Sequence, residues 1–494
     1  MWLRRLPAFL ILLVAINLSA AQDTRQVSEP KIPPSCVRLE ASLRAIDNKL
    51  AESDESKLDT DRIQKAIDAC KPGTAVELSP TRTNNAFLTG PLEMRTGITL
   101  LIDKGVTLLG SRDPKVYDLG TNQPGEGVTP GLCGTIATGT PPPTFPAPQR
   151  PVRGGCRPLI SVVNATDVGI MGDGVIDGRG YARLAGKDYS WWQMARKAEP
   201  TNERYYSTRL IVASQADGLV LYRIALYNSP NFHVSVNKTN GFTAWGVHIQ
   251  TPTDKALDAR NTDGIDPGSS TNITVAHSWI DNGDDNIAIK TGTSHMSVLD
   301  NHFFSGHGMS IGSETFTGQS FLLVDRLTLD HTTSGIRIKS NVTRGGPVHD
   351  LVYRNICMRD VPIPIAISPY YTNQTTEPFE DPYYKGDRIP DYKRVALEDV
   401  FSETPGTVLI AGLDDQHRTE VTLNNIVIKG ITRSQLHLAF ADLHLPACPA
   451  GRGTNLPLTD LPSSVKLIPS SEAGCGARPP APPDPCEGRF LPMR

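Results

Sequence analysis

The sequence predicts an all-β protein that folds as a right-handed parallel β-helix. Two observations lead to this prediction: a spaced apolar pattern recurs along the chain, and polar clusters recur at matching positions within it. The 494-residue chain also contains 42 Gly and 40 Pro, a content typical of β-structure with many turns. The net charge is −3 and no run of Lys or Arg is present, so we expect no nucleic-acid or membrane partner.

The repeat places apolar side chains at offsets 0, +2, +5 and +7. Its clearest copy begins at Leu219, and the next begins 23 residues later at Phe242. Each copy predicts two short strands whose inward-facing residues alternate, separated by a phase slip where the chain turns. Two further copies are imperfect, since Ser278 and Asn301 stand at apolar positions. The remaining copies begin at Ile273, Met296, Leu322, Leu351 and Val421.

Stacking follows from the pattern because one copy cannot bury its apolar side alone. Intervals longer than 23 residues fit loops that are inserted on one face of the stack. A β-sandwich is the alternative, but its hairpins would show tight-turn signals such as Asn-Gly, and these are scarce here. The sequence therefore favours coils of strand, turn, strand, turn.

An amphipathic helix is predicted ahead of the first coil. Asp59 and Thr60 precede Ile63 and Ile67, which share one face, and Asp59 has the chemistry of an N-terminal cap. We expect this helix to cap the open end of the stacked core.

The chain is expected to divide into three parts. Residues 1–21 have the features of a signal peptide: a positive start, a short apolar run and small residues before the expected cleavage site. The apolar run is too short to span a bilayer, so we expect a secreted or periplasmic protein. Residues 22–445 form the expected β-helix domain, interrupted by a Pro-rich loop at about 111–158, and residues 446–494 form an extended surface tail.

Eight cysteines fit an oxidising compartment. Proximity in the sequence suggests disulfides between Cys36 and Cys70 and between Cys133 and Cys156. A third pair is expected among Cys448, Cys475 and Cys486. Cys357 lies in a strand-like run and is expected to be a free buried thiol. No pair has zinc-ligand spacing, so we expect no metal and no cofactor.

Four polar clusters occupy the same phase of four consecutive copies, 10 to 15 residues before each copy begins. Adjacent coils lie about 5 Å apart, so the clusters should converge in one groove. Alone, each has an ordinary explanation: a tight turn, a solvated loop, a calcium-ligand pair or a charged strand face. The clusters are Asn261-Thr262-Asp263, Gly283-Asp284-Asp285, Gly306-His307-Gly308 and Arg337-Ile338-Lys339.

Together the clusters suit glycoside hydrolysis, in which one carboxylic acid protonates the leaving oxygen and another carboxylate activates water. Packing Asp263, Asp284 and Asp285 together should raise the pKa of at least one of them by like-charge repulsion. Arg337 and Lys339 alternate with an apolar residue, so both should face a solvent-filled groove and bind a sugar carboxylate.

At this point the sequence resembles the polygalacturonases of glycoside hydrolase family 28. The resemblance is carried by "NTDGIDPGSSTNITVAHSWIDNGDDNIAIKTG", "SGHGMSIGSE" and "GIRIKS", with support from "GDGVIDGRG" and "ALYNSPNFHV". It spans about residues 55–430 and implies a right-handed β-helix that hydrolyses pectic galacturonan with inversion.

The resemblance also implies roles for single residues. Asp284 resembles the general acid, Asp263 and Asp285 the pair that activates water, and His307 the histidine that tunes the acid. The residues expected to bind substrate are Arg337, Lys339, Asn261 and either Tyr370 or Tyr371.

Three alternatives remain open. One is a rhamnogalacturonan or xylogalacturonan hydrolase of the same family, although rhamnogalacturonan hydrolases generally lack His307 and the Arg-x-Lys signature. The second is a calcium-dependent pectate lyase on the same fold, and the third is a non-catalytic adhesion β-helix. Endo or exo action stays undecided, and we expect a monomer.

Overall fold

The computed structural model describes most of the chain after the expected signal peptide. Residues 1–21, most of the Pro-rich insertion, Cys448 and Cys475 lie outside the described residues. The described ranges are 22–119, 132–137, 155–200, 203–252, 259–371, 386–446, 453–470 and 485–493.

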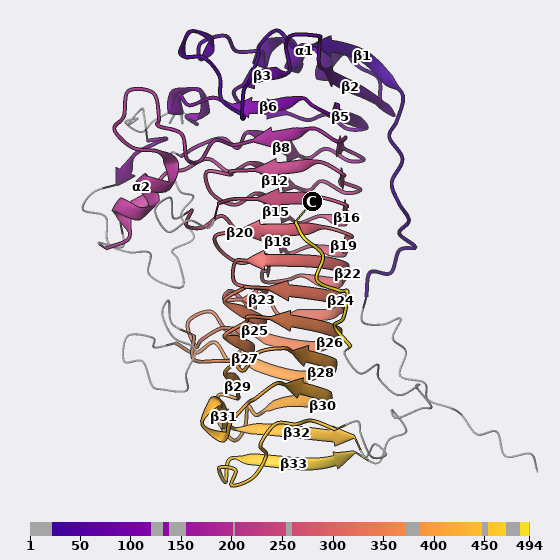
Figure 1. The fold of residues 1–494 in the computed structure, drawn as a ribbon, viewed down its shortest axis with the longest axis vertical. Helices are drawn as coiled ribbons and strands as arrows, with labels where there is room; N and C mark the ends of the chain where they lie inside the picture. Colours follow the sequence, from indigo (N-terminus) through magenta and orange to yellow (C-terminus); the bar gives the residue numbers. More distant parts are fainter. Residues whose placement is uncertain are drawn as a thin grey trace, which may run out of the picture.

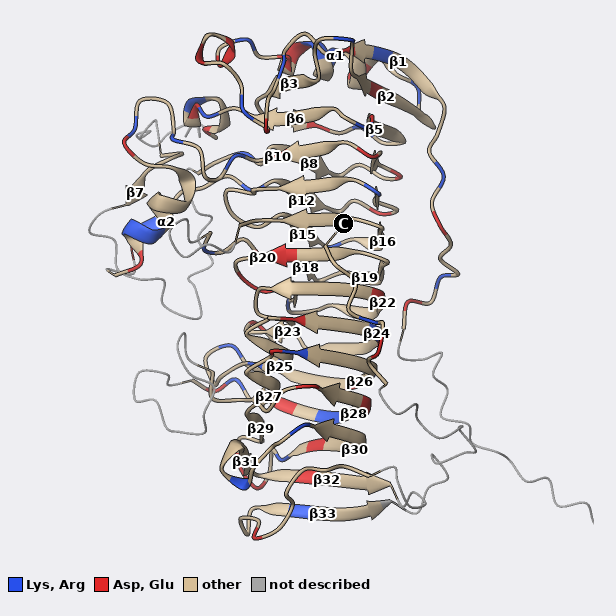
Figure 2. Cartoon of the chain, in the orientation of Figure 1, with Lys and Arg blue, Asp and Glu red and all other residues tan. Residues whose placement is uncertain are grey.

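The predicted parallel β-helix is confirmed. The chain winds through stacked coils along one long axis (Figure 1), and its described strands form two extended parallel ladders. Charged residues of both signs are interspersed along the coils in Figure 2, without a broad basic face in that view. Among the described residues, no helix is both long and apolar enough to cross a membrane.

The larger ladder contains 20 described strands. They are β1 (Ser35–Glu40), β2 (Thr74–Ser79), β3 (Ala86–Thr89), β5 (Ile98–Ile102), β6 (Thr107–Gly110), β9 (Gly169–Met171), β10 (Val175–Asp177), β13 (Val220–Tyr222), β14 (Ala225–Tyr227), β16 (Asn240–Trp245), β17 (His248–Gln250), β19 (Thr271–Ala276), β20 (Trp279–Asn282), β22 (Ser294–Ser305), β24 (Gln319–Asp330), β26 (Pro347–Arg359), β28 (Asp391–Ser402), β30 (Thr419–Ile428), β32 (Ala441–Pro446) and β33 (Val465–Ser470).

The smaller ladder contains 11 described strands, which stack in strict chain order. They are β4 (Leu92–Glu93), β8 (Ile160–Val163), β12 (Ile211–Ser214), β15 (Val234–Asn237), β18 (Ile265–Gly268), β21 (Ile287–Ile289), β23 (Met309–Gly312), β25 (Ser334–Lys339), β27 (Ile363–Ser368), β29 (Val408–Ala411) and β31 (Leu436–Ala439).

A few short elements stand outside the ladders. Strands β7 (Ile136–Ala137) and β11 (Arg204–Tyr205) pair antiparallel with each other. The helices are α1 (Thr60–Ala69), α2 (Trp191–Ala198) and three 3₁₀ turns at Glu52–Asp54, Pro114–Tyr117 and Arg433–Gln435.

The repeat of offsets 0, +2, +5 and +7 maps onto the larger ladder only. Leu221 pairs with Ala244 and Leu226 with Ile249, as stacking of identical offsets requires. Each of these coils also contains a third strand, in the smaller ladder, which the two-strand prediction missed. The third strand holds only three to six residues, too few for a distinct apolar period.

The imperfect copies have a structural reason. Ser278 is buried between β19 and β20, and Asn301 is buried at the equivalent point within β22 of the next coil. The Asn301 side chain accepts a hydrogen bond from the Ser278 backbone N–H at 2.9 Å. The Asn301 amide in turn donates to the carbonyl of Val275 at 2.9 Å. These side chains satisfy backbone groups that the bend removes from the ladder, so their polarity stabilises the turn.

Helix α1 lies across the N-terminal end of the stack (Figure 1), with Ile63 and Ile67 buried in the main core. The prediction that Asp59 caps the N-terminus of this helix is wrong, because the Asp59 side chain makes no capping hydrogen bond. Its carboxylate instead accepts hydrogen bonds from Arg62 at 2.6 Å and from the Leu88 backbone N–H at 3.4 Å. Asp59 therefore ties the helix to the first coils.

The first described residues run along the outside of the larger ladder before the chain reaches β1 (Figure 1). Asp23 is buried: its backbone N–H donates to Ser297 at 3.0 Å, and its carboxylate accepts from Thr274 at 2.7 Å. Arg25 donates to the carbonyl of Phe242 at 2.9 Å. This segment thus fastens three middle coils from outside.

Residues beyond 445 also extend the ladder, because β33 pairs with β32 inside the part expected to be a surface tail. Residues 485–493 then cover the outer side of earlier coils, where Arg489 donates to the carbonyl of Asn355 at 2.7 Å. The segment is fixed by a disulfide between Cys357 and Cys486.

Two of the predicted disulfides, Cys36–Cys70 and Cys133–Cys156, are confirmed. The free thiol predicted for Cys357 is wrong, because Cys357 pairs with Cys486. The partners are 129 residues apart in the sequence, so proximity along the chain could not reveal them.

We expect the double variant Cys357→Ala/Cys486→Ala to be less stable than the wild type by about 2–5 kcal/mol, since the C-terminal segment loses its tether. Urea denaturation of the oxidised proteins measures this difference. Cys133→Ala/Cys156→Ala, which opens a sequence separation of only 23 residues, is the matched control and should cost less. An unchanged midpoint for the first variant would contradict the structural role of this tether.

Candidate active site

The four predicted polar clusters lie together on successive coils of the smaller ladder. Asp263, Asp285 and His307 each stand two positions before the residues that pair between β18, β21 and β23. Arg337 and Lys339 lie on β25, the next strand along the ladder. Arg337 and Lys339 pair with Ser310 and Gly312, three and five positions after His307, so the common phase holds for the aspartates and His307 only. The two cations reach the same site through their contacts with Asp285.

Asp285 contacts two positively charged side chains. Its carboxylate accepts hydrogen bonds from Lys339 at 2.8 Å, Arg337 at 3.2 Å and the Ser310 hydroxyl at 2.8 Å. Burial alone would raise the pKa of Asp285, but the charges of Lys339 and Arg337 outweigh burial and hold the pKa well below its usual range. Asp285 is therefore ionised and a weak base.

Asp284 is more accessible: 20% of its side chain is exposed, against 2% for Asp285. Its Oδ1 lies 3.2 Å from Nδ1 of His307, and Oδ2 accepts a hydrogen bond from Asn261 at 3.4 Å. Burial would raise the pKa of Asp284, but the hydrogen bond and charge of His307 lower it below its usual value. The contact with His307 therefore favours the ionised form of Asp284.

Asp263 has the opposite environment. It is buried, and its Oδ1 makes no hydrogen bond within the described residues. Burial, followed by the charge of Asp266, raises its pKa well above the usual value. The sequence predicted that one carboxyl pKa would be raised, but repulsion among the three aspartates is not the main cause. Burial is.

The glycines beside His307 are required by close packing. Gly306 and Gly308 both have positive φ values, +53° and +78°. A Cβ on Gly308 would lie 2.1 Å from the carbonyl oxygen of Ser334, so no larger residue fits there. The two glycines allow the loop to return to Asp284, whose carbonyl accepts a hydrogen bond from the His307 backbone N–H at 2.8 Å.

Buried side chains that the sequence did not single out hold the aspartate loops. The His233 ring is fully buried, with Nδ1 3.2 Å and 3.1 Å from the carbonyls of Thr262 and Asp263, and burial lowers its pKa to about 4. Asn282 donates to the carbonyls of Thr262 and Asp285 at 2.8 and 2.9 Å. These contacts fix the spacing of the two loops. His233 lies in "NFHV" and Asn282 in "DNGDDN", but the sequence does not reveal that these two side chains are buried against the loops.

Two further charged groups were also missed. Asp266 lies three residues after Asp263, and Lys290 directly follows β21, so both belong to the same strip. Nζ of Lys290 lies 3.5 Å from Asp266 and 3.9 Å from Asp263. Both residues fall within the quoted motif, and the alternation of strand β18 could have placed Asp266 on the outer face.

The two tyrosines left open by the sequence have different places. The ring of Tyr371 lies over the cations, with its centroid 5.5 Å from the Arg337 guanidinium and 5.2 Å from the Lys339 ammonium. The Tyr370 hydroxyl instead donates to the carbonyl of Leu413 at 2.6 Å. Tyr371 is the one that joins the cationic group.

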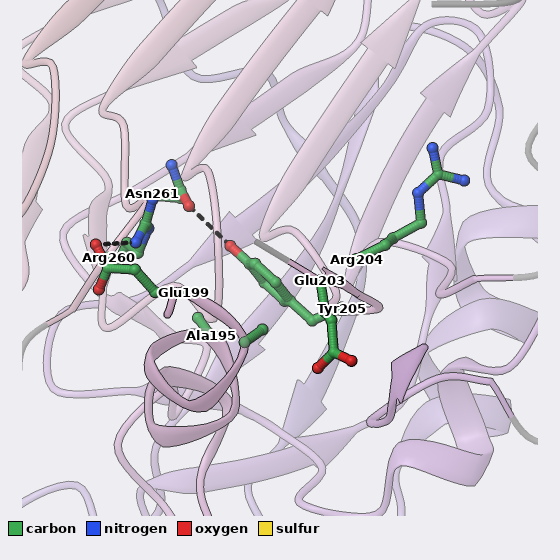
Figure 3. Close-up of a pocket in the computed structure, with 8 residues that line it drawn as sticks. Ala195, Glu199, Glu203, Arg204, Tyr205, Arg260 and Asn261 are labelled. Carbon is green, nitrogen blue, oxygen red and sulfur yellow. Dashed lines mark hydrogen bonds and ion pairs between the residues drawn. The ribbon is translucent and has the colours of Figure 1, made fainter. Parts of the chain in front are cut away.

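A pocket of about 250 Å³ adjoins the acidic residues on the side of α2 (Figure 3). Asn261 lines it and accepts a hydrogen bond from the Tyr205 hydroxyl at 2.8 Å. Arg260 pairs with Glu199 just beyond the end of α2. Asn261 therefore joins this pocket to Asp284.

A metal ion is disfavoured by the charges already present. Ligand atoms of Asp284, Asp285 and His307 lie within 4.8 Å of one another, the one such group among the described residues. Asp285, however, already contacts Lys339 and Arg337, so a divalent cation would meet two positive charges. The set fits acid–base chemistry better than metal binding.

Comparisons with known proteins identify the family of this chain. The model of the glycosyl hydrolases family 28 matches residues 149–442. An endo-polygalacturonase of Pectobacterium carotovorum subsp. carotovorum is 39% identical over 411 residues, which are 82% of this chain and 90% of that protein. A polygalacturonase of Ralstonia nicotianae is 33% identical over 467 residues, covering 84% and 82%.

A solved structure gives the same result. The polygalacturonase from Erwinia carotovora ssp. carotovora superposes with a TM-score of 0.70 at 37% identity, over 84% of this chain and all of that one. Family model, sequence relatives and structure agree over most of the chain. The chain therefore belongs to glycosyl hydrolases family 28.

Proposed function

We propose that this protein is an endo-acting polygalacturonase that hydrolyses α-1,4-galacturonosyl linkages in pectic galacturonan with inversion. The observation that carries the proposal is the position of Arg337 and Lys339 beside Asp285, with the Tyr371 ring against both cations. Cations at fixed positions next to an acid distinguish a uronic acid from a neutral sugar. The 39% identity to an endo-polygalacturonase supports endo action.

Asp284 is the proposed general acid. It is the most exposed of the three aspartates, so its carboxyl group can reach the leaving oxygen, and as the acid it has to be protonated in the substrate complex. As negative charge develops on that oxygen, Asp284 donates its proton, and the contact with His307 stabilises the carboxylate that remains.

Asp263 and Asp285 are proposed to handle the attacking water. The two differ in basicity, because cations stabilise ionised Asp285 while burial raises the pKa of Asp263. Asp285 is thus suited to orient the water, and ionised Asp263 to accept its proton.

A rhamnogalacturonan hydrolase is less well supported, because its substrate alternates uronic acid with neutral sugar while cations here follow the acidic cluster closely. A calcium-dependent lyase is less well supported, because a divalent cation at Asp285 would meet the charges of Lys339 and Arg337.

We further propose export from the cytoplasm, supported by the signal-like N-terminus and by three disulfides among the described residues.

We expect polygalacturonate to be cut to new reducing ends, with viscosity falling long before most bonds are broken. Activity should persist in EDTA, and the products should lack absorbance near 235 nm because hydrolysis forms no double bond. Early NMR spectra should show the anomer opposite to the substrate linkage. Unsaturated products, or activity that chelation abolishes and calcium restores, would establish a lyase instead.

We expect Asp284→Asn to lower kcat by about 10²–10⁴-fold, because the amide has nearly the same shape but cannot donate the required proton. Steady-state kinetics with circular dichroism separates lost chemistry from lost fold. Asp173→Asn, at an exposed ion pair with Arg223, is the control and should keep full activity. More than about a tenth of wild-type kcat in Asp284→Asn would refute the acid assignment.

We expect Arg337→Gln and Lys339→Met to raise KM on polygalacturonate, each lost charged hydrogen bond costing about 1.5–3 kcal/mol. The structure corrects the prediction of a solvent-filled setting, because Lys339 is only 6% exposed and binds Asp285. A fall in kcat should therefore accompany the change in KM, most strongly for Lys339→Met.

Methyl-esterified pectin is the internal control for these variants, since it offers the cations no anion. Wild type and variant should differ less on that substrate than on polygalacturonate. An equal loss on both substrates would mean that the pair acts only through Asp285.

A further inference from the structure

A second charged cluster adjoins the proposed catalytic residues. Nζ of Lys290 lies among three carboxylates, 3.5 Å from Asp266, 3.9 Å from Asp263 and 4.0 Å from Glu314. Lys290 directly follows β21, while Asp266 lies on β18 of the preceding coil and Glu314 follows β23 of the next. One ammonium group thus bridges three successive coils.

The two aspartates of this cluster have few other partners. Asp263 and Asp266 are 4% and 3% exposed. Within the described residues, Oδ1 of Asp263 and both carboxylate oxygens of Asp266 make no hydrogen bond. A buried ionised carboxylate without hydrogen bonds is costly, so the charge of Lys290 is the main compensation available to both.

Lys290 is itself fixed from the other side. Glu314 contacts the guanidinium of Arg344 at 3.3 Å, and Arg344 donates to the Ser313 hydroxyl at 2.7 Å. The ring of Phe232 lies 5.8 Å from the ammonium. The chain of charges Asp266, Lys290, Glu314, Arg344 alternates in sign and holds the ammonium near Asp263.

We infer that Lys290 is a positioning residue that keeps Asp263 ionised as the catalytic base against the competing charge of its neighbour Asp266. This inference rests on the proposed function, in which Asp263 accepts a proton from water. Lys290 need not touch the substrate to act in this way.

The balance at Asp263 involves charges from every neighbouring coil. Asp266 raises the pKa of Asp263 through repulsion, and Asp284 and Asp285 do so to a smaller extent, whereas Lys290 lowers it. Burial raises the pKa of Asp266 itself to about 7, and attraction to Lys290 partly offsets that effect. The titratable and charged groups that face the pair are Arg209, Tyr205, His233, Asp284, Asp285 and Lys290. Glu314 acts on the pair through Lys290, and His307, Arg337 and Lys339 act on Asp285.

The test uses two substitutions with opposite expected effects. Lys290→Met removes the attraction, so the acidic limb of the kcat/KM profile on polygalacturonate should move to higher pH by about one unit or more. Asp266→Asn removes the repulsion, so the same limb should move to lower pH. In the double variant the two shifts should largely cancel.

Two matched variants complete the design. Lys290→Arg keeps the charge and should leave the limb near its wild-type position. Lys393 is also partly buried between two carboxylates, 3.5 Å from Asp391 and 3.4 Å from Glu420, but it lies on the larger ladder. Lys393→Met should therefore leave the limb unchanged, and thermal melting of every variant confirms folding.

Each outcome is decisive. Opposite shifts for Lys290→Met and Asp266→Asn support the inference. A uniform loss of kcat/KM without movement of the limb, or shifts of both variants in the same direction, overturns it and would make Lys290 a substrate contact or a structural residue. If Lys290→Met does not fold, a shift in Lys290→Arg as large as one unit, or no shift in Asp266→Asn, overturns it equally.

Failure of the proposed function would look different, since the wild type would not hydrolyse polygalacturonate at all. The protonation of Asp263 and Asp266 can also be followed without substrate. Infrared spectra recorded across the pH range show the band of protonated carboxylic acids. Lys290→Met should retain that band to higher pH than the wild type, and Asp266→Asn should lose part of it.

Discussion

The register of the smaller ladder is the constraint on which the rest of the molecule depends. Parallel strands one coil apart bring equivalent positions to within about 5 Å. Asp263, Asp285 and His307 occupy equivalent positions on successive coils, so the strand register brings these side chains together. The rigid core beneath them, rather than the flexibility of any segment, sets the spacing of the reactive groups.

The same register creates an electrostatic problem. Stacking places Asp263, Asp266, Asp284 and Asp285 on two neighbouring coils, where their mutual repulsion would favour protonation. Cations on the following coils offset this repulsion, because Lys290 lies beside Asp266 and Lys339 lies beside Asp285. As a result, the pKa values of Asp284 and Asp285 lie below the usual range, whereas those of Asp263 and Asp266 lie above it. Chemistry that needs both an acid and a base depends on this difference more than on the number of carboxylates.

Much of this arrangement was visible in the sequence because a solenoid turns spacing along the chain into position in space. The stacking of Leu221 on Ala244 and the common strip of polar clusters followed from offsets alone. The third strand of each coil was missed because strands as short as Ile287–Ile289 have no measurable period. Which side chains face each other across coils, as Lys290 and Asp266 do, depends on register to a single residue.

Other features could not have been predicted because they join distant parts of the chain. Cys357 looked like a buried thiol, since its partner Cys486 stands 129 residues away. The choice between Tyr370 and Tyr371 depended on contacts made after β27, where the Tyr370 hydroxyl binds the carbonyl of Leu413 and the Tyr371 ring lies against Arg337. In each case the contact that decides the outcome joins two coils outside the apolar repeat, so the repeat could not predict it.

The attachment of the first residues has a consequence for the order in which the molecule can assemble. Coils can stack one after another as the chain becomes available, each using its predecessor as a template. Asp23 does not follow that order, because its partners Thr274 and Ser297 lie about 250 residues downstream. This segment can therefore dock only after the middle coils have formed, so its attachment comes later than the stacking of the first coils.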